Sequence, residues 1–218
     1  RSFCTTPQCS PSRSSLLTGF YPSATGVIGN VGAAGGAAMD QPTLAPELQA
    51  SGYRTGYFGK WHLGNKEIAC AGWDQKIFKT HDSTAEEGAL GFLSDPTTRS
   101  KPFALFVSIN NPHDIYKFKR HEPGARQIAL PPSWEGESFD GKPPIQKQFM
   151  EADQGKAIVG KPRAEWERYH DCYREKTRLY DKHVGVILDE LKRQGQWENT
   201  IVIVTSDHGD MDAQHKLI

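Results

Sequence analysis

Cys9 and Arg13 are the residues whose placement in this chain points most directly to chemistry. They open and close a Cys-Ser-Pro-Ser-Arg segment that is followed shortly by Gly19. Pro11 is compatible with a first helical turn, where its missing N–H would be unpaired anyway, and Gly19 can supply a left-handed stop. The pattern predicts a short helix over 9–19 with Cys9 at its N-terminal end. The free N–H groups and the positive dipole end there lower a thiol pKa and suit a tetrahedral anion.

A second pair of candidate residues, Lys60 and His62, follows a predicted strand. The sequence predicts a helix over 44–50 and a short strand over 53–58, after which Gly59 turns the chain. Alternate side chains of an extended segment point to one side, so Lys60 and His62 are expected to share a face. Taken singly, a lysine is more often an exposed amine, and a histidine beside a tryptophan is more often a hydrogen-bonded, half-buried residue.

Two further histidines follow apolar segments that read as buried strands. Residues 200–206 are β-branched and uninterrupted, which predicts a buried parallel strand that leads into Asp207 and His208. Ligands of α/β sheets gather at the carboxyl ends of strands, so this pair is placed where a metal ion would be held. A similar strand over 103–109 precedes His113. In isolation, these residues would be an ordinary turn aspartate and loop histidines.

Taken together, three of these motifs resemble the signatures of the type I, formylglycine-dependent sulfatases of the alkaline-phosphatase-like superfamily. They are the Cys-x-Pro-Ser-Arg segment with its trailing Leu-Thr-Gly, the Gly-Lys-Trp-His of residues 59–62, and the Thr-Ser-Asp-His-Gly of residues 205–209. Phe20 departs from the family pattern, which usually has a basic residue after Leu-Thr-Gly. The resemblance implies an α/β fold with a mostly parallel central sheet flanked by helices, here incomplete at both ends.

The resemblance also implies a role for each candidate residue. Cys9 is oxidised to formylglycine, whose hydrated form attacks sulfur and later expels sulfate. Arg13 and Lys60 neutralise charge on the transferring group, His62 deprotonates the second hydroxyl, and His113 binds sulfate near the leaving oxygen.

A metal site is implied at Asp207, His208 and Cys9, with Ca²⁺ as the expected ion. Because hard Ca²⁺ prefers oxygen ligands, the histidine leaves Mn²⁺ and Zn²⁺ as alternatives.

Composition excludes several other classes of function. The 218 residues include 26 basic and 26 acidic side chains, so no net charge favours nucleic acid or a membrane surface. The sequence contains no apolar run long enough to cross a bilayer. The 4 cysteines are too few and too scattered for a disulfide framework or a zinc cluster.

The chain is expected to form one partial sulfatase catalytic domain over 1–218. Residues 26–38 are rich in glycine and alanine and predict a loop, and a helix is expected around 83–92. Residues 115–162 are rich in proline and charge and predict a long excursion on the substrate side. A long helix is predicted over 163–194 from its apolar periodicity. Within it, structural roles are assigned to His170, Cys172 and His183.

The expected reaction is hydrolysis of a sulfate ester of a sulfated small molecule or polysaccharide. Maturation of Cys9 would require a formylglycine-generating or anaerobic maturation enzyme, and the resemblance suggests a periplasmic or secreted protein. The upstream aspartates and downstream lysine of the family are missing, so an internal fragment without activity of its own is expected. Two alternatives stay open: a phosphonate or phosphate ester hydrolase of the same superfamily, and a non-catalytic binder of sulfated glycans.

Overall fold

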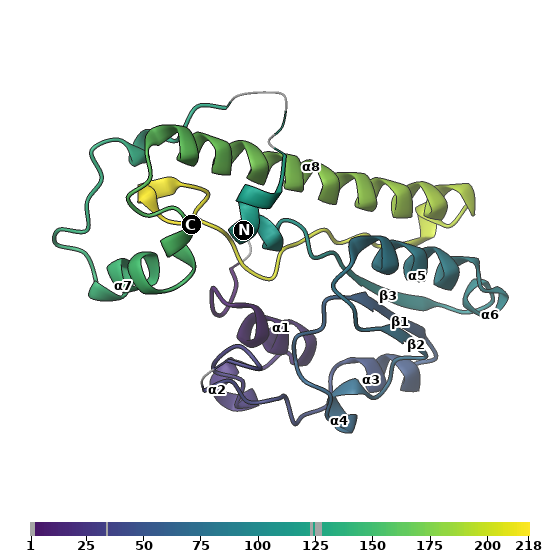
Figure 1. The fold of residues 1–218 in the computed structure, drawn as a ribbon. Coiled ribbons are helices and arrows are strands. Elements are labelled where there is room, and N and C mark those ends of the chain that lie inside the picture. The colour runs from purple at the N-terminus through teal and green to yellow at the C-terminus, as the bar shows by residue number, and fades with distance from the viewer. Residues whose placement is uncertain (1–2, 34, 123, 125–127) are drawn as a thin grey trace. The chain divides into compact units, whose positions relative to one another are not determined.

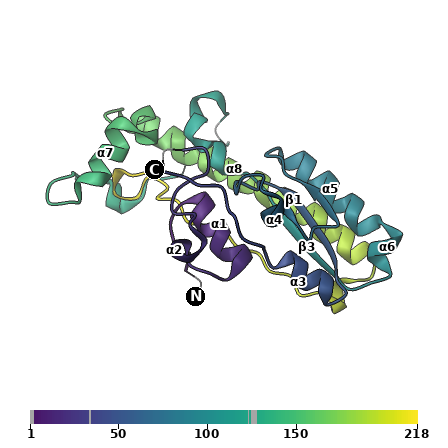
Figure 2. The same cartoon turned by 90° about the horizontal axis from the view of Figure 1, so that it is seen from below.

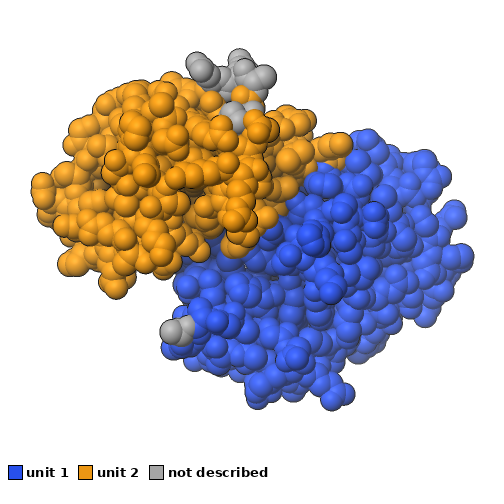
Figure 3. Space-filling model, in the orientation of Figure 1, with its two compact units in different colours: residues 1–110, 183–209 blue, residues 111–182, 210–218 orange. Residues whose placement is uncertain are grey.

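The structure is a computed structural model that describes residues 3–33, 35–122, 124 and 128–218. The described chain forms two compact units, coloured separately in Figure 3. Unit 1 comprises residues 1–110 and 183–209, and unit 2 comprises residues 111–182 and 210–218. The sequence carries no linker signal that marks this division.

Unit 1 is an α/β unit, and its elements can be followed in Figure 1. In chain order they are α1 (Cys9–Thr18), α2 (Pro22–Thr25), α3 (Ala45–Ala50), β1 (Arg54–Gly59), α4 (Glu67–Cys70), β2 (Gln75–Ile77), α5 (Asp82–Ser94), α6 (Pro96–Arg99), β3 (Phe103–Ser108) and the 3₁₀ turn η4 (Trp197–Asn199). Helices α1 and α2 lie side by side in both Figure 1 and Figure 2. The predicted helices over 9–19, 44–50 and 83–92 and the strands over 53–58 and 103–109 are all present within a few residues.

The sheet is parallel, with the strand order β2-β1-β3. The side chains of its central strand β1 alternate between the two faces of the sheet. Both faces are covered, so the strand is buried along nearly its whole length. Tyr57 packs with Leu17, Trp61 and Trp73 on one face, whereas Phe58 packs with the α5 residues of the other face. The predicted fold class, an α/β fold built on a parallel sheet with flanking helices, is confirmed.

The prediction of a buried parallel strand over 200–206 is wrong for the structure as described. This segment forms no regular secondary structure and pairs with no described strand, and Ile201 and Ile203 are 90% and 80% exposed. β-branched residues favour an extended backbone, but a buried strand also needs a neighbouring edge and a covering layer, which are tertiary features.

Unit 2 is largely helical and has its own apolar core. It contains η1 (His113–Arg120), η2 (Pro132–Trp134), α7 (Pro144–Ala152), η3 (Gln154–Ala157), η5 (Gln214–Lys216) and residues 163–182 of α8 (Arg163–Arg193), whose remaining residues belong to unit 1. The core gathers Ile115, Phe118, Met150, Trp166 and Tyr169. Trp166, Tyr169 and Cys172 of the long helix thus form a packing surface. No helix in the described ranges combines the length and the apolar character that crossing a membrane requires.

The three helix residues expected to be structural all have packing or polar partners. His170 is 3% exposed and its Nδ1 lies 3.0 Å from Asp212 Oδ1. Cys172 is fully buried in the unit 2 core. His183 Nδ1 lies 2.6 Å from a carboxylate oxygen of Glu86 on α5.

The two predicted loop regions contain little regular structure. Residues 26–38 hold no helix or strand among those described, and 115–162 hold only 3₁₀ turns and the short helix α7. Residue 34 of the first region and residues 123 and 125–127 of the second lie outside the described residues.

Candidate active site

Helix α1 presents Cys9 as its first residue, as predicted. Gly19 ends the helix with a left-handed φ of 76°. The N-cap residue Gln8 makes no side-chain cap; instead the backbone N–H of Ser10 donates to Asn30 Oδ1 at 2.9 Å. A residue of the predicted loop over 26–38 therefore satisfies one of the orphan donors at the end of the helix that carries Cys9.

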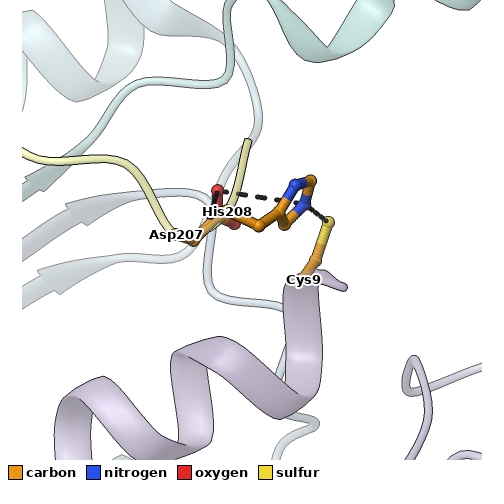
Figure 4. A group of neighbouring side chains, drawn as sticks. All are labelled: Cys9, Asp207 and His208. Carbon is orange, nitrogen blue, oxygen red and sulfur yellow. Dashed lines mark hydrogen bonds and ion pairs between the residues drawn. The ribbon is translucent and has the colours of Figure 1, made fainter. Parts of the chain in front are cut away.

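Cys9 is 5% exposed and lies between two nitrogen groups. Its Sγ is 3.3 Å from His208 Nε2, a contact drawn as a dashed line in Figure 4. The same Sγ is 3.6 Å from Lys60 Nζ. The contact with Cys9 raises the pKa of His208 to about 9, while burial lowers the pKa of Lys60 and its attraction to Cys9 opposes that shift. The surroundings of Sγ are cationic, which favours a negatively charged group at this position.

Arg13 connects the helix to both strand ends. Its Nε donates to Asp207 Oδ2 at 2.9 Å, and its Nη1 donates to the Lys60 carbonyl at 2.7 Å and to Ser108 Oγ at 2.6 Å. Burial disfavours ionisation of Asp207, but the charges of Arg13, His208 and Lys60 together with the Arg13 hydrogen bond outweigh it, and the pKa of Asp207 is lowered. Arg13 thus brings the ends of β1 and β3 and residue 207 together at α1.

The two serines of the Cys-Ser-Pro-Ser-Arg segment form further links. Ser10 Oγ donates to the His62 carbonyl at 2.5 Å and accepts from the N–H of Val31 at 3.1 Å. Ser12 Oγ donates to the Asp207 carbonyl. Both serines are buried, so the segment positions its neighbours through the side chains between Cys9 and Arg13.

Tyr57 stabilises the turn that carries Lys60, a role that no sequence pattern predicted. Its hydroxyl donates to the Lys60 carbonyl at 2.8 Å, and its ring packs edge-on against Trp61 and Trp73. Gly59 has a φ of 111°, and a Cβ there would lie 2.1 Å from the Ser108 carbonyl oxygen, so only glycine fits this turn. Tyr57 and Gly59 together set the path that brings Lys60 to Cys9.

Replacing Tyr57 by phenylalanine is expected to reduce the free energy of unfolding by about 1 kcal/mol, the usual value of one buried hydrogen bond. The loss stays modest because the Lys60 carbonyl keeps its bond from Arg13. Urea unfolding of the variant measures it. Tyr53→Phe is the matched control, since Tyr53 is 40% exposed, and it is expected to leave the unfolding midpoint unchanged. Equal effects of the two variants would contradict a role for the Tyr57 hydroxyl.

The expectation that Lys60 and His62 share a face of an extended segment is wrong. Strand β1 ends at Gly59, and His62 has a left-handed φ of 58°, so the alternation of an extended chain does not reach it. Lys60 contacts Cys9, whereas the buried Nδ1 of His62 has no hydrogen-bond partner among the described residues. The catalytic role expected of His62 is therefore still a prediction.

His113 is an exposed residue that opens η1 in unit 2. Its ring lies edge-on to Tyr116 with 6.0 Å between the ring centroids. Cys9, Arg13, Lys60, Asp207 and His208 all belong to unit 1 and are joined by the contacts above, so the structure brings these five together. The predicted sulfate contact of His113 stays a prediction.

Cys9, Asp207 and His208 could hold a metal ion, since their ligand atoms all lie within 4.8 Å of one another (Figure 4). This group fits one side of a metal site. Asp207 offers carboxylate oxygens, although one of them already accepts from Arg13. Ca²⁺ takes six to eight oxygen ligands, so these residues cannot by themselves complete a calcium shell, whereas an imidazole, a carboxylate and a thiol also suit Zn²⁺.

The sequence matches the model of the Sulfatase family over residues 1–217. Among curated relatives, it is 27% identical to a Delta 4,5-hexuronate-2-O-sulfatase of Bacteroides thetaiotaomicron, over 97% of this chain and 48% of that protein. It is 28% identical to an ulvan-active sulfatase of Formosa agariphila, over 94% of this chain and 42% of that protein. The chain therefore spans about half the length of the curated relatives it matches.

Solved structures share the fold. A 2-O GAG sulfatase superposes with a TM-score of 0.81 at 24% identity, covering 100% of this chain and 51% of that one. A protein solved in complex with its substrate D-glucosamine-2-N,6-O-disulfate superposes with a TM-score of 0.72 at 17% identity, covering 99% of this chain and 58% of that one. Because the family match spans nearly every residue, including Cys9, Lys60 and Asp207, this chain belongs to the sulfatase family.

Proposed function

We propose that the protein hydrolyses sulfate esters of a carbohydrate, with Cys9 converted to formylglycine as the nucleophile. The observation that supports this most is the set of groups around Cys9 Sγ, namely Lys60 Nζ at 3.6 Å and His208 Nε2 at 3.3 Å. The relatives support the carbohydrate class, because those named above act on hexuronate and ulvan sulfates and a solved neighbour binds a glucosamine disulfate.

The reaction follows from the chemistry of a hydrated aldehyde at residue 9. One hydroxyl oxygen forms a bond to sulfur while the bond from sulfur to the carbohydrate oxygen breaks, and the alcohol leaves with a proton. Loss of the proton from the second hydroxyl then restores the aldehyde carbonyl and expels sulfate. Addition of water regenerates the hydrate, so the residue is unchanged after each turnover.

The residues around Cys9 have distinct roles in the proposed reaction. The ammonium of Lys60 neutralises negative charge beside residue 9, and Arg13 holds Asp207 and the Lys60 carbonyl in place. His62 is proposed to take the proton of the second hydroxyl, and His113 to contact the sulfate. A divalent ion held by Asp207, His208 and residue 9 would polarise the sulfate oxygens when bound.

The same proposal includes a maturation partner and a cellular location. Oxidation of Cys9 requires a maturation enzyme, and a polymeric sulfated substrate does not cross a membrane by itself. A periplasmic or secreted location is therefore part of the proposal.

The test combines the chemical state of Cys9 with turnover by the full-length protein. Peptide mass analysis after expression with a maturation enzyme is expected to find the aldehyde at Cys9 in place of the thiol. Turnover is then compared on paired sulfate and phosphate esters of one alcohol, and the sulfate ester is expected to be the better substrate. Preferred phosphate turnover would favour the related phosphohydrolase function, and an unmodified thiol with glycan binding but no turnover would favour a non-catalytic binder.

A further inference from the structure

We propose that a basic hollow on unit 2 binds a polyanionic segment of the sulfated carbohydrate. This inference rests on the proposed function for the identity of the glycan. The hollow has a volume of about 550 Å³ and is lined by Lys119, Lys161, Glu165 and Arg168. Of the four lining residues that the structure describes, three are cationic.

The turn η1 supplies one side of the hollow. Its apolar residues Ile115 and Phe118 are each 1% exposed and pack into the unit 2 core. Its last turn carries Lys117, Lys119 and Arg120 outward, all three exposed. Because the apolar side is anchored, the backbone that carries these cations is held in place before any ligand binds.

The start of α8 supplies the other side. Lys161 lies just before the first helical residue Arg163, at the positive end of a helix of 31 residues. Arg168 is half-buried, and its Nη2 donates to the His121 carbonyl at 2.8 Å. That bond orders the Arg168 guanidinium at the hollow before a ligand binds. Binding therefore costs less side-chain conformational entropy than it would with a freely moving arginine.

The basic side chains of the hollow are not paired within the described part of the chain. Elsewhere on α8, Arg163, Arg178 and Arg193 each form an ion pair with a glutamate three or four residues away. Lys119, Lys161 and Arg168 form no ion pair with any residue the structure describes, and Glu165 is the single acid of the lining. The chain as a whole has no net charge, so the excess of positive charge at the hollow arises from the local arrangement of its residues.

The lining favours a charged carbohydrate over a simple anion. The cations come from two separate elements around a hollow of this size, which suits anionic groups spaced along a chain. The Glu165 carboxylate would repel a bare phosphate or sulfate, but it can accept hydrogen bonds from sugar hydroxyls. Sulfates and uronate carboxylates beside free hydroxyls provide this mixture.

The experiment measures binding of a heparin octasaccharide to the full-length protein by calorimetry at low ionic strength. The variant Lys119→Glu/Lys161→Glu/Arg168→Glu is expected to weaken binding at least about tenfold, because three ion pairs with the ligand are lost. The double variant Lys119→Glu/Lys161→Glu keeps the Arg168 backbone bond and is expected to weaken binding in the same direction. The matched control, Lys147→Glu/Lys156→Glu/Lys182→Glu, makes the same charge change at exposed residues of unit 2 outside the hollow.

The control is expected to bind like the unmodified protein, and turnover of a small sulfated monosaccharide is expected to be equal in all variants. Equal weakening by the control would overturn the proposal, as would equally tight binding of inorganic sulfate or of duplex DNA through the same residues. Binding is also measured in a Cys9→Ala background, which needs no turnover. If the protein proves to have no sulfatase activity while the hollow still determines octasaccharide binding, the proposed function fails and the binding site stands.

Discussion

Replacing Cys9 by alanine is expected to lower turnover of a sulfate ester at least a thousandfold, roughly the scale on which loss of a covalent nucleophile acts. Serine at this position is expected to allow at most one sulfation event per protein. A serine ester has no second hydroxyl on the same carbon, so the route that expels sulfate is missing. End-point assays of turnover measure the loss of activity in Cys9→Ala. Intact-protein mass analysis after incubation with substrate detects the single sulfation of Cys9→Ser.

Cys4→Ser is the matched control for both substitutions. Cys4 is exposed and lies a few residues before Cys9, so its loss changes the thiol content without touching the site. Turnover of this variant is expected to be unchanged. Normal turnover by Cys9→Ser would exclude the aldehyde chemistry.

Replacing Arg13 by lysine is expected to lower turnover by about a hundredfold or more, the scale associated with losing one preorganised donor. An ammonium keeps the charge, but it cannot donate to Asp207 in one direction and to the Lys60 carbonyl and Ser108 in another. The side chains of Arg13 and Asp207 are 10% and 18% exposed, so a mispositioned partner leaves charge poorly compensated. We also expect a loss of about 2 kcal/mol in the free energy of unfolding.

Arg54→Lys is the control for Arg13→Lys. Arg54 opens β1 and forms ion pairs with Asp74 and Asp95 at 3.8 and 3.4 Å, but no described contact links it to Cys9. Its replacement is expected to change the free energy of unfolding by less than about 1 kcal/mol and to leave turnover unchanged. Turnover of Arg13→Lys close to that of the unmodified protein would show that the positioning of Asp207 and Lys60 by Arg13 is not needed for turnover.

The sequence by itself determined the elements whose signals are local. Pro11 lies in the first turn of helix α1 and Gly19 ends it, and the segments 54–59 and 103–108 form parallel strands close to the predicted ranges. The apolar periodicity over 163–194 likewise predicted the long helix α8. Propensity, capping and side-chain periodicity act over a few residues, so they can be read without knowing the fold.

Only the tertiary structure decided which groups surround Cys9. The bonds from Arg13 to Asp207 and from Ser10 to Asn30 join residues far apart in sequence, and no local pattern specifies them. The left-handed turn at His62 overrode an alternation that holds only for an extended chain. Residues 200–206 have the composition of a buried strand, but burial depends on a neighbouring strand and a covering layer, which composition does not encode.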